Sequence, residues 1–444
     1  MAMRRATSSK LLLIVTAALT AGLLAAPAVQ AAPARNHGPG IGTVGSATLA
    51  GPASAPGPAS AAAPTAPCAF KGIGTCASVN PKISTYVTYT GIASACDFTW
   101  KIHWGDGSKV KKVVQNGPSD GQVFLARHTY GTRRQAAYTI AVDGTVKGAS
   151  GCFVNSGDFR FTLLAYVALG DSYSAGDGAD AYLAGTGFGF SLFGGNECLR
   201  SANAYPELVD QDLGNSSPNE KKSATFVFRA CTGAVISDFT NRQLTADKRK
   251  VRAQLATLNG SPGGVGLVTL TIGGNDAGFG PIMRYCATRT AKNPSCKDHS
   301  QQAVDAVLAT IEPKLTALYK QIKSAKGVAK DATILVLGYP KFFPAGRSKS
   351  CATGDPFHKF MPSDMAWING VIKRFDAKIA AAAKTAGVTY VNVYNAFARH
   401  ELCASDPDLH EVVILPLSHH QLESFHPTAQ GQKVLAVLTE QAIR

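Results

Sequence analysis

The stretch LAYVALGDSY, residues 164–173, joins an unbroken apolar run to a polar turn that carries a serine. An unbroken run of this length predicts a strand buried on both faces, as in a parallel sheet. The serine then lies at the carboxyl end of the strand, where open α/β sheets bind their ligands. A serine hydroxyl is a poor nucleophile until a base takes its proton. The stretch therefore predicts an α/β fold with Ser172 as a candidate nucleophile, and the base must come from elsewhere in the chain.

Four more short apolar runs follow and alternate with helical stretches, which predicts a parallel sheet covered by helices on both faces. The predicted strands are Thr225–Phe228, Gly266–Ile272, Thr333–Leu337 and Val388–Val393. The predicted helices are Gln302–Lys323, kinked or divided at Pro313, then Asp364–Thr385, and a last one from about Thr428. One α/β domain is therefore expected over residues 164–444.

Polar motifs stand where these strands end. Gly233 lies in CTGA (231–234), Asn275 in GGND (273–276) and His426 in SFHP (424–427), just before the last helix. Alone, such motifs have ordinary explanations as a helix N-cap, a turn or a helix start. Together with Ser172 they supply a nucleophile, a base, and the N–H and amide donors of an oxyanion hole. Four such groups at matched strand ends favour an acyl-transfer site, with Asp276 bracing the Asn275 turn.

With these four blocks the chain resembles the GDSL, or SGNH, hydrolases, which carry Ser, Gly, Asn and His in this order. The resemblance runs from about Tyr166 to Arg444 and is strongest to the secreted actinobacterial lipase/esterase branch. It implies a flavodoxin-like parallel sheet, with Ser172 as nucleophile and His426 as general base. It also implies an oxyanion hole formed by Ser172, Gly233 and Asn275, and no metal or cofactor. The first block reads GDSY instead of GDSL, a change at a packing position.

The third member of the catalytic triad is open. The residue three before the histidine is usually Asp in this family and is Glu423 here. A backbone carbonyl such as that of Ser424 is the alternative acceptor for the histidine Nδ1–H. The G-x-S-x-G elbow of the common α/β-hydrolases is absent, because residues 170–174 end in Ser174. That fold is therefore rejected.

The first 67 residues have the features of an export signal and a spacer. Arg4, Arg5 and Lys10 precede an apolar run over 11–24, and small residues follow at 29–31. This pattern predicts a signal peptide over 1–31 and a secreted protein. Residues 32–67 are rich in Ala, Pro, Gly and Ser, which predicts a linker that cannot bury a core. No later run predicts a membrane-spanning helix.

Residues 68–163 show short alternating runs broken by Gly and Asp, which predicts a small β-sandwich. The motifs WGDGS (104–108) and HTY (128–130) resemble those of polycystic-kidney-disease-type (PKD) immunoglobulin-like domains. A hairpin turn followed by a core aromatic residue is the simpler explanation. The resemblance implies a domain that spaces the enzyme or contacts a cell wall or glycan.

The chain has ten cysteines, an even number that suits the oxidising compartment to which a signal peptide leads. Their order around the strands predicts pairing between sequential neighbours. The expected pairs are Cys198–Cys231, Cys286–Cys296 and Cys351–Cys403 in the hydrolase domain, and Cys68–Cys76 and Cys96–Cys152 in the first domain. There is no Cys-x-x-Cys pair, which argues against a zinc site.

The net charge is +15, with the basic residues scattered along the chain. Such a charge keeps a protein soluble or draws it to anionic surfaces such as teichoic acids and phospholipid headgroups. The densest run, residues 248–252, is interpreted as a solvated helix face. Nothing else in the sequence supports nucleic-acid binding.

The sequence thus predicts a secreted serine carboxylester hydrolase that acts on small-molecule or lipid esters through an acyl-enzyme, as a monomer without stable membrane insertion. Two alternatives stay open. One is a surface- or glycan-binding protein with a vestigial hydrolase domain, and the other is an esterase that deacetylates cell-wall or plant glycans. Two apolar loops either line an acyl pocket or pack internally. They hold Phe188, Phe190 and Phe193, and Phe342, Phe343 and Pro344.

Overall fold

The computed structural model describes residues 65–71, 74–87, 89–90, 96–116, 124–130, 137–148, 153–154, 157–188, 196–214, 225–260, 263–290, 292–353, 355–412 and 423–443. All structural statements below concern these ranges. The predicted signal peptide and nearly all of the predicted linker lie outside them.

A five-stranded parallel sheet forms the centre of the C-terminal part, in the order β12-β11-β15-β16-β19. Its strands are β11 (Ala165–Gly170), β12 (Phe226–Phe228), β15 (Val265–Thr271), β16 (Val328–Leu337) and β19 (Thr389–Val391). Every residue of β11 and β15 is buried, as their unbroken apolar sequences require. The first strand lies between the second and the third, which is the flavodoxin-like order. The predicted α/β fold is confirmed.

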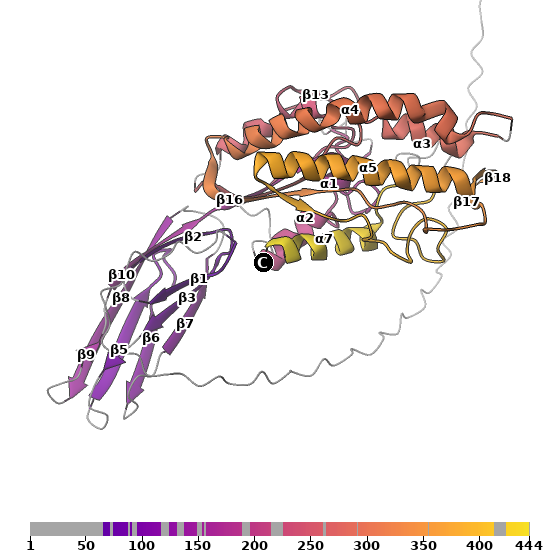
Figure 1. Ribbon diagram of the computed structural model, residues 1–444. Coiled ribbons are helices and arrows are strands. Elements are labelled where there is room, and N and C mark those ends of the chain that lie inside the picture. The colour runs from indigo at the N-terminus through magenta and orange to yellow at the C-terminus, as the bar shows by residue number, and fades with distance from the viewer. Residues whose placement is uncertain are drawn as a thin grey trace, which may run out of the picture. The chain divides into compact units, whose positions relative to one another are not determined.

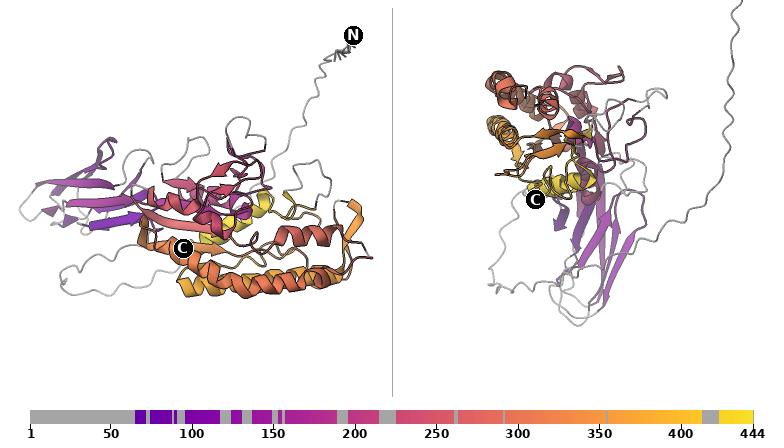
Figure 2. Two further views of the ribbon diagram at one scale, coloured as in Figure 1. Left: turned by 90° about the horizontal axis from the view of Figure 1, so that it is seen from above. Right: turned by 90° about the vertical axis from the view of Figure 1, so that its right-hand side faces the viewer.

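Four main helices cover this sheet, namely α2 (Tyr205–Leu213), α4 (Cys296–Lys323), α5 (Pro362–Ala386) and α7 (Ala429–Ile443). The long helices α4 and α5 run side by side, as the views in Figures 1 and 2 agree. Figure 1 shows α2 and α7 on the opposite side of the sheet. Right-handed crossovers produce this arrangement, because the chain leaves β11 toward one edge of the sheet and β15 toward the other.

Helix α4 continues through Pro313, so the expectation that it is divided there is wrong, whereas a kink at Pro313 stays a prediction. Proline removes one backbone hydrogen bond and favours a break. Here the buried residues Ile311 and Leu315 lie on either side of Pro313 and belong to the same hydrophobic core. Burial on both sides of the proline offsets the lost hydrogen bond. The sequence alone does not show this packing.

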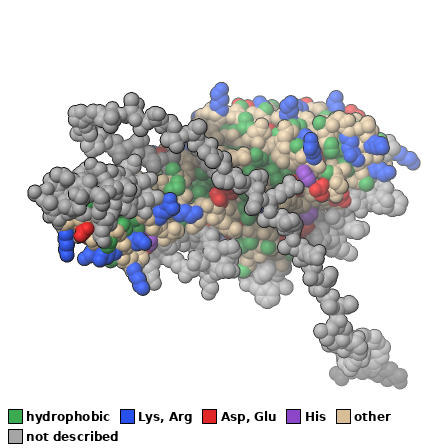
Figure 3. Space-filling view, turned by 90° about the horizontal axis from the view of Figure 1, so that it is seen from below, with side chains coloured by type: hydrophobic (Ala, Val, Ile, Leu, Met, Phe, Trp, Pro, Cys, Tyr) green, Lys and Arg blue, Asp and Glu red, His purple; other side chains and the backbone are tan. Residues whose placement is uncertain are grey.

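The basic run 248–252 is also corrected, because it belongs to a hairpin and not to a helix. Strands β13 (Gln243–Leu244) and β14 (Lys250–Val251) pair antiparallel, and Lys248 has a φ of 62° in the turn. The Thr245 hydroxyl donates to Asp247 and to the Arg249 carbonyl, which fixes this turn. Figure 3 shows Lys and Arg side chains at several separate places on one face of the molecule, with uncharged surface and some Asp and Glu side chains between them.

The N-terminal part contains two sheets that share one hydrophobic core. One sheet has the order β1-β3-β7, with β1 (Cys68–Lys71), β3 (Lys82–Val87) and β7 (Phe124–Thr129). The other has the order β2-β10-β8-β5-β6, with β2 (Gly74–Ser78), β10 (Gly157–Leu163), β8 (Ala137–Gly148), β5 (Cys96–His103) and β6 (Lys111–Asn116). Phe70 and Ile83 from the first sheet and Trp100 and Phe161 from the second belong to the same buried cluster. Two sheets around one core form the expected sandwich.

The two motifs that suggested a PKD-like domain meet in this sandwich. The Trp104 and His128 rings stack with centroids 4.7 Å apart, and His128 Nε2 lies 2.8 Å from Asp106 Oδ2. The Tyr130 hydroxyl donates to the Trp104 carbonyl at 2.6 Å. This cluster holds the turn after β5 against the end of β7. The PKD-like identity of the domain stays a prediction.

Disulfides join Cys68 to Cys76, Cys198 to Cys231, Cys286 to Cys296 and Cys351 to Cys403 in the structure. These are the sequential pairs expected from the order of the cysteines. The predicted Cys96–Cys152 pair stays a prediction because Cys152 lies outside the described residues.

Candidate active site

Ser172 lies at the carboxyl end of β11, at the start of the single-turn helix α1 (Ser172–Ala175). The turn between strand and helix places Gly170 at a φ of 123°, a conformation that L-residues with a side chain rarely adopt. Asp171 is the N-cap of α1, and its carboxylate accepts the Tyr173 N–H at 3.1 Å. Asp171 can therefore cap the helix while Ser172, the next residue, serves as a candidate nucleophile. The Ser172 side chain remains 7% exposed.

The buried Asp171 carboxyl fixes this turn to the neighbouring strands. It accepts hydrogen bonds from the Thr271 hydroxyl at 2.6 Å and from the Tyr339 hydroxyl. Burial raises the pKa of Asp171 to about 6, although these hydrogen bonds and the nearby His426 act in the opposite direction. Because its carboxylate oxygens accept hydrogen bonds from Thr271 and Tyr339, Asp171 anchors the turn that carries Ser172.

His426 comes from the segment before α7 and reaches the Ser172 side chain directly. Its Nε2 lies 2.7 Å from Ser172 Oγ, a distance suited to proton transfer. The Tyr173 hydroxyl donates to the Phe425 carbonyl at 2.6 Å, so the residues next to Ser172 and His426 are bonded to each other. Residues 254 positions apart in the chain thus form one rigid pair.

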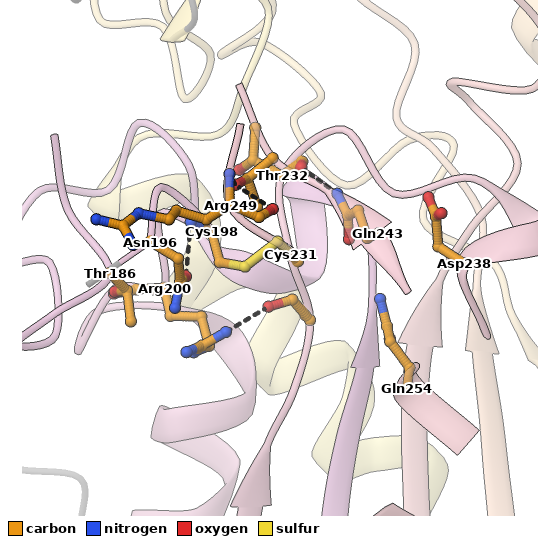
Figure 4. The surroundings of a disulfide bond; sticks show 12 residues. Thr186, Asn196, Cys198, Arg200, Cys231, Thr232, Asp238, Gln243, Arg249 and Gln254 are labelled. Carbon is orange, nitrogen blue, oxygen red and sulfur yellow. Dashed lines mark hydrogen bonds between the residues drawn. A yellow bond between two sulfur atoms is a disulfide. The ribbon is translucent and has the colours of Figure 1, made fainter. Parts of the chain in front are cut away.

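The Gly233 loop follows β12 and is attached to the nucleophile strand. The Cys231 N–H donates to the Gly170 carbonyl at 3.0 Å, and the Thr232 N–H donates to the Cys198 carbonyl at 3.1 Å. Figure 4 shows the Cys198–Cys231 disulfide beside this loop, with the Gln243 side chain donating to the Thr232 carbonyl at 2.8 Å. Gly233 has a φ of 78° and is exposed. A glycine meets both conditions, because it adopts this conformation and leaves its N–H uncovered.

Asn275 follows β15 and is exposed beside the same loop. Its Nδ2 donates one hydrogen to the Ala234 carbonyl at 2.9 Å, and the amide has a second hydrogen to offer. The Asp276 carboxylate accepts the Ile236 N–H at 3.0 Å, and burial raises the pKa of Asp276. Asp276 thus braces the Asn275 turn against the short helix η2 (Ile236–Phe239), as the sequence suggested.

Glu423 is buried at 5% exposure and lies near the nucleophile turn. Its backbone carbonyl accepts the His426 N–H at 2.9 Å. Its carboxylate accepts a hydrogen bond from the Tyr182 hydroxyl at 3.4 Å. The Tyr182 hydroxyl also accepts the Gly178 N–H at 3.1 Å. The structure therefore connects the Glu423 carboxylate, through Tyr182, to the segment that follows Ser172.

Several residues that hold the site were not found from the sequence. The Gln254 side chain pairs with both the N–H and the carbonyl of Gly170, at 2.7 and 2.8 Å. Tyr339 and Gln243 are further examples. Gln254 lies in a short helix, Tyr339 in a loop after β16 and Gln243 in the short strand β13, and no motif surrounds them. Their burial, which is unusual for polar residues, would identify them as candidates, but burial is a property of the tertiary structure.

Two adjoining cavities open at the Ser172–His426 pair. One has a volume of about 110 Å³ and an apolar wall that includes Phe342, Met283 and Phe375. The other, of about 560 Å³, extends along Gly233 and Asn275 toward Arg284, Thr288 and Val412. Of the two apolar loops noted in the sequence, the second thus contributes Phe342 to the smaller cavity, whereas Phe343 is fully buried against Phe360. Phe188 contacts Tyr182, and Phe190 and Phe193 lie outside the described residues.

Two features of the described ranges bear on cofactors and membranes. No helix there combines the length and apolar character needed to cross a membrane. In the same part of the chain, no group of three or more His, Cys, Asp or Glu side chains is placed to hold a metal ion.

Comparisons with known proteins agree with this geometry. The model of the GDSL-like lipase/acylhydrolase family matches residues 168–434. Lipase 1 of Streptomyces coelicolor is 34% identical over 267 residues, which cover 60% of this chain and 82% of that protein. Lipase of Streptomyces rimosus is 34% identical over 273 residues, which cover 62% of this chain and 84% of that protein. The crystal structure of phospholipase A1 from Streptomyces albidoflavus is 33% identical, covers 62% of this chain and 98% of its own, and has a TM-score of 0.48.

The family match spans all four sequence blocks, from the strand before Ser172 to the helix after His426. The predictions of a hydrolase and of this family are confirmed. The chain therefore belongs to the GDSL-like lipase/acylhydrolase family and is a carboxylic ester hydrolase.

Proposed function

We propose that the protein is a secreted serine esterase or lipase that works through an acyl-enzyme, with Ser172 as nucleophile and His426 as general base. The observation that carries the proposal is the 2.7 Å contact between Ser172 Oγ and His426 Nε2 where two cavities meet. The similar lipases support an ester substrate. The predicted signal peptide supports export.

In the acylation step, Ser172 Oγ attacks the ester carbonyl carbon while His426 Nε2 takes its proton. The carbonyl oxygen becomes an oxyanion. We assign its stabilisation to the N–H groups of Ser172 and Gly233 and to the second amide hydrogen of Asn275, because preorganised donors stabilise charge as it develops. The C–O bond then breaks, and the imidazolium gives its proton to the leaving alcohol. A water molecule, deprotonated by the same imidazole, releases the acid and restores Ser172.

The smaller cavity suits the acyl chain and the larger one suits the alcohol part of the ester. Apolar walls bind a chain without directional bonds, and Phe342 and Phe375 supply such walls. The larger cavity carries polar groups such as Thr232 and Arg284, which suit a polar or charged alcohol. This assignment keeps the glycan-esterase alternative open, because acetyl groups also fit the smaller cavity.

A p-nitrophenyl ester series from acetyl to palmitoyl tests both the activity and this assignment. An apolar cavity of about 150 Å³ holds a benzene molecule, so a cavity of about 110 Å³ suits roughly four to six carbons. We expect kcat/KM to peak at butyryl or hexanoyl and to fall for longer chains. A constant or rising kcat/KM up to palmitoyl would place the chain in the larger cavity instead. No hydrolysis of any member would contradict the esterase proposal and favour the surface-binding alternative.

Glu423→Ala should lower kcat by roughly 10- to 100-fold. The imidazole needs an acceptor for its Nδ1–H, and a carboxylate would also stabilise the imidazolium, but a backbone carbonyl such as that of Ser424 orients the ring too. The Tyr182 contact of Glu423 makes its role indirect at least in part. Tyr182→Phe is the matched control, because it removes that contact and keeps the carboxylate. If Glu423→Ala were as inactive as His426→Ala while folded by circular dichroism, the carboxylate would be a full triad member.

The PKD-like identity of the N-terminal sandwich, the monomeric state and a contact with cell wall or glycan stay predictions. The rival proposal, a binding protein with a vestigial hydrolase domain, requires that the catalytic groups have no function. The Ser172–His426 contact and the open cavities beside it argue against this. A pull-down of the full chain on insoluble cell-wall or plant glycan would test the binding part of the proposal separately from hydrolysis.

A further inference from the structure

The segment after the nucleophile helix carries a buried carboxyl group that the mechanism above does not use. Asp177 lies five residues after Ser172 and has no exposed surface. Its Oδ2 accepts a hydrogen bond from the Thr232 hydroxyl at 3.2 Å. Its Oδ1 is buried and makes no hydrogen bond to any atom in the described part of the chain. Asp177 also borders the larger cavity, together with Ser172 and Gly233.

Thr232 is the residue directly before the proposed oxyanion donor Gly233, so its position sets the direction of the Gly233 N–H. Three contacts hold it. Its N–H donates to Cys198 and its carbonyl accepts from Gln243, as Figure 4 shows for the latter. Its hydroxyl donates to Asp177. The Asp177 contact differs from the other two because it comes from the same turn that carries the nucleophile.

Three titratable side chains surround Asp177, from three segments of the chain. Glu423 is itself buried, Tyr182 donates to Glu423, and His410 places its Nε2 2.5 Å from the Gly178 carbonyl. Two buried carboxyl groups thus lie close together, and no Lys or Arg is among the main charges acting on Asp177. A neighbouring carboxylate disfavours the ionised form of a buried carboxyl group such as that of Asp177.

Burial raises the pKa of Asp177 to about 8, with Glu423 adding to the rise and with Thr232, His410 and the Gly178 N–H opposing it. Below that pH the group is neutral, and above it the group carries a negative charge. The unpartnered Oδ1 is the oxygen that can carry the proton, because Oδ2 accepts from Thr232.

We propose that Asp177 is a positioning residue that, as a neutral carboxylic acid, accepts a hydrogen bond from Thr232 and so aligns the Gly233 N–H with the oxyanion formed next to Ser172. The inference rests on the proposed serine-esterase function. Neutrality matters because a second negative charge beside the oxyanion hole opposes the charge that develops there in the transition state. Below about pH 8 Asp177 is neutral and should not affect the pH dependence of activity. As the pH rises through this value, Asp177 ionises and activity should fall.

Two substitutions separate alignment from charge. Asp177→Asn keeps an acceptor for Thr232 and cannot ionise, whereas Asp177→Leu has a similar size and no acceptor. Thr232→Val removes the donor of the same bond. Asp180→Asn is the matched control, because Asp180 is an exposed carboxylate three residues further on. Steady-state kinetics with p-nitrophenyl butyrate from pH 6 to 10, read at the isosbestic wavelength of nitrophenol, give kcat and KM for each variant.

We expect Asp177→Leu and Thr232→Val each to lower kcat about 10- to 100-fold with KM changed less than threefold, because transition-state stabilisation is lost and ground-state binding is kept. The double variant should be no worse than either single one. Asp177→Asn should keep at least a third of the wild-type kcat at pH 7 and lose the decline above about pH 8. Asp180→Asn should match the wild type throughout. An Asp177→Asn as inactive as Asp177→Leu, or an Asp177→Leu as active as the wild type, would overturn the proposal.

The state of the carboxyl group is measurable without activity. In protein labelled with ¹³C at aspartate carboxyl groups, one resonance should titrate near pH 8 and be missing from Asp177→Asn. If that resonance titrated at or below pH 4, Asp177 would be ionised at neutral pH and the proposal wrong. An inactive wild type with this resonance in place would contradict the esterase function and leave the buried neutral acid established, so the two failures are distinguishable.

Discussion

Ser172→Ala is expected to abolish ester hydrolysis, with kcat reduced by about 10⁴-fold or more. The hydroxyl is the atom that forms the acyl-enzyme, and the remaining oxyanion donors and cavities support only the slow attack of water. The measurement is kcat for p-nitrophenyl butyrate with the purified full chain. Residual activity above about a tenth of the wild type would contradict the role of Ser172.

The structure predicts that this variant stays folded. Ser172 is buried, and its side chain contacts His426. Losing such a hydrogen bond costs about 1 kcal/mol, a small part of the stability of a domain this size. The anchoring contacts of Asp171 are unaffected. Circular dichroism and thermal unfolding should therefore match the wild type within a few degrees.

His426→Ala is expected to lower kcat by a similar factor of about 10⁴, because without the imidazole the Ser172 hydroxyl keeps its proton and the leaving alkoxide receives none. The Tyr173 contact with the Phe425 backbone does not involve the imidazole and should hold the segment in place. Activity measured over the same ester series tests this.

Free imidazole provides a control that separates the two variants. The truncated side chain leaves space beside Ser172 in the smaller cavity, and imidazole in solution can enter as a general base. We expect it to restore part of the activity of His426→Ala and none of the activity of Ser172→Ala. Equal loss in both variants without any rescue, together with an altered circular dichroism spectrum, would show that His426 is needed for folding and not for proton transfer.

The parallel sheet followed from the sequence because its strands are apolar on both faces. Strands β11 and β15 are fully buried and matched their predicted positions to within one residue. Strand β16 begins at Val328, before the predicted start at Thr333. The prediction began too late because the first half of the strand contains exposed Lys330 and Asp331, which interrupt the apolar run. Between Val328 and Thr333 the pairing with β15 is irregular, so this half of the strand carries no apolar pattern in its side chains.

The four candidate catalytic groups could also be named from the sequence, because each follows a strand or precedes a helix and carries its motif with it. The residues that position them could not be. Gln254 bonds Gly170 across 84 residues, and Asp177 bonds Thr232 across 55. A buried amide or carboxyl group has no local signature, because the sequence around it does not differ from that around the same residue in an exposed loop.

The sequence by itself thus determined the order of strands and helices and the four candidate groups of an acyl-transfer site, because apolar periodicity and turn residues act locally. Only the tertiary structure decided which oxygen each buried polar group meets. It connected Tyr182 to the Glu423 carboxylate, a contact that no motif in the sequence indicates. It also kept α4 unbroken at Pro313, and it put Asp177 under the oxyanion loop. The physical reason is that desolvation and hydrogen-bond satisfaction depend on neighbours far apart in the chain, which only the folded arrangement brings together.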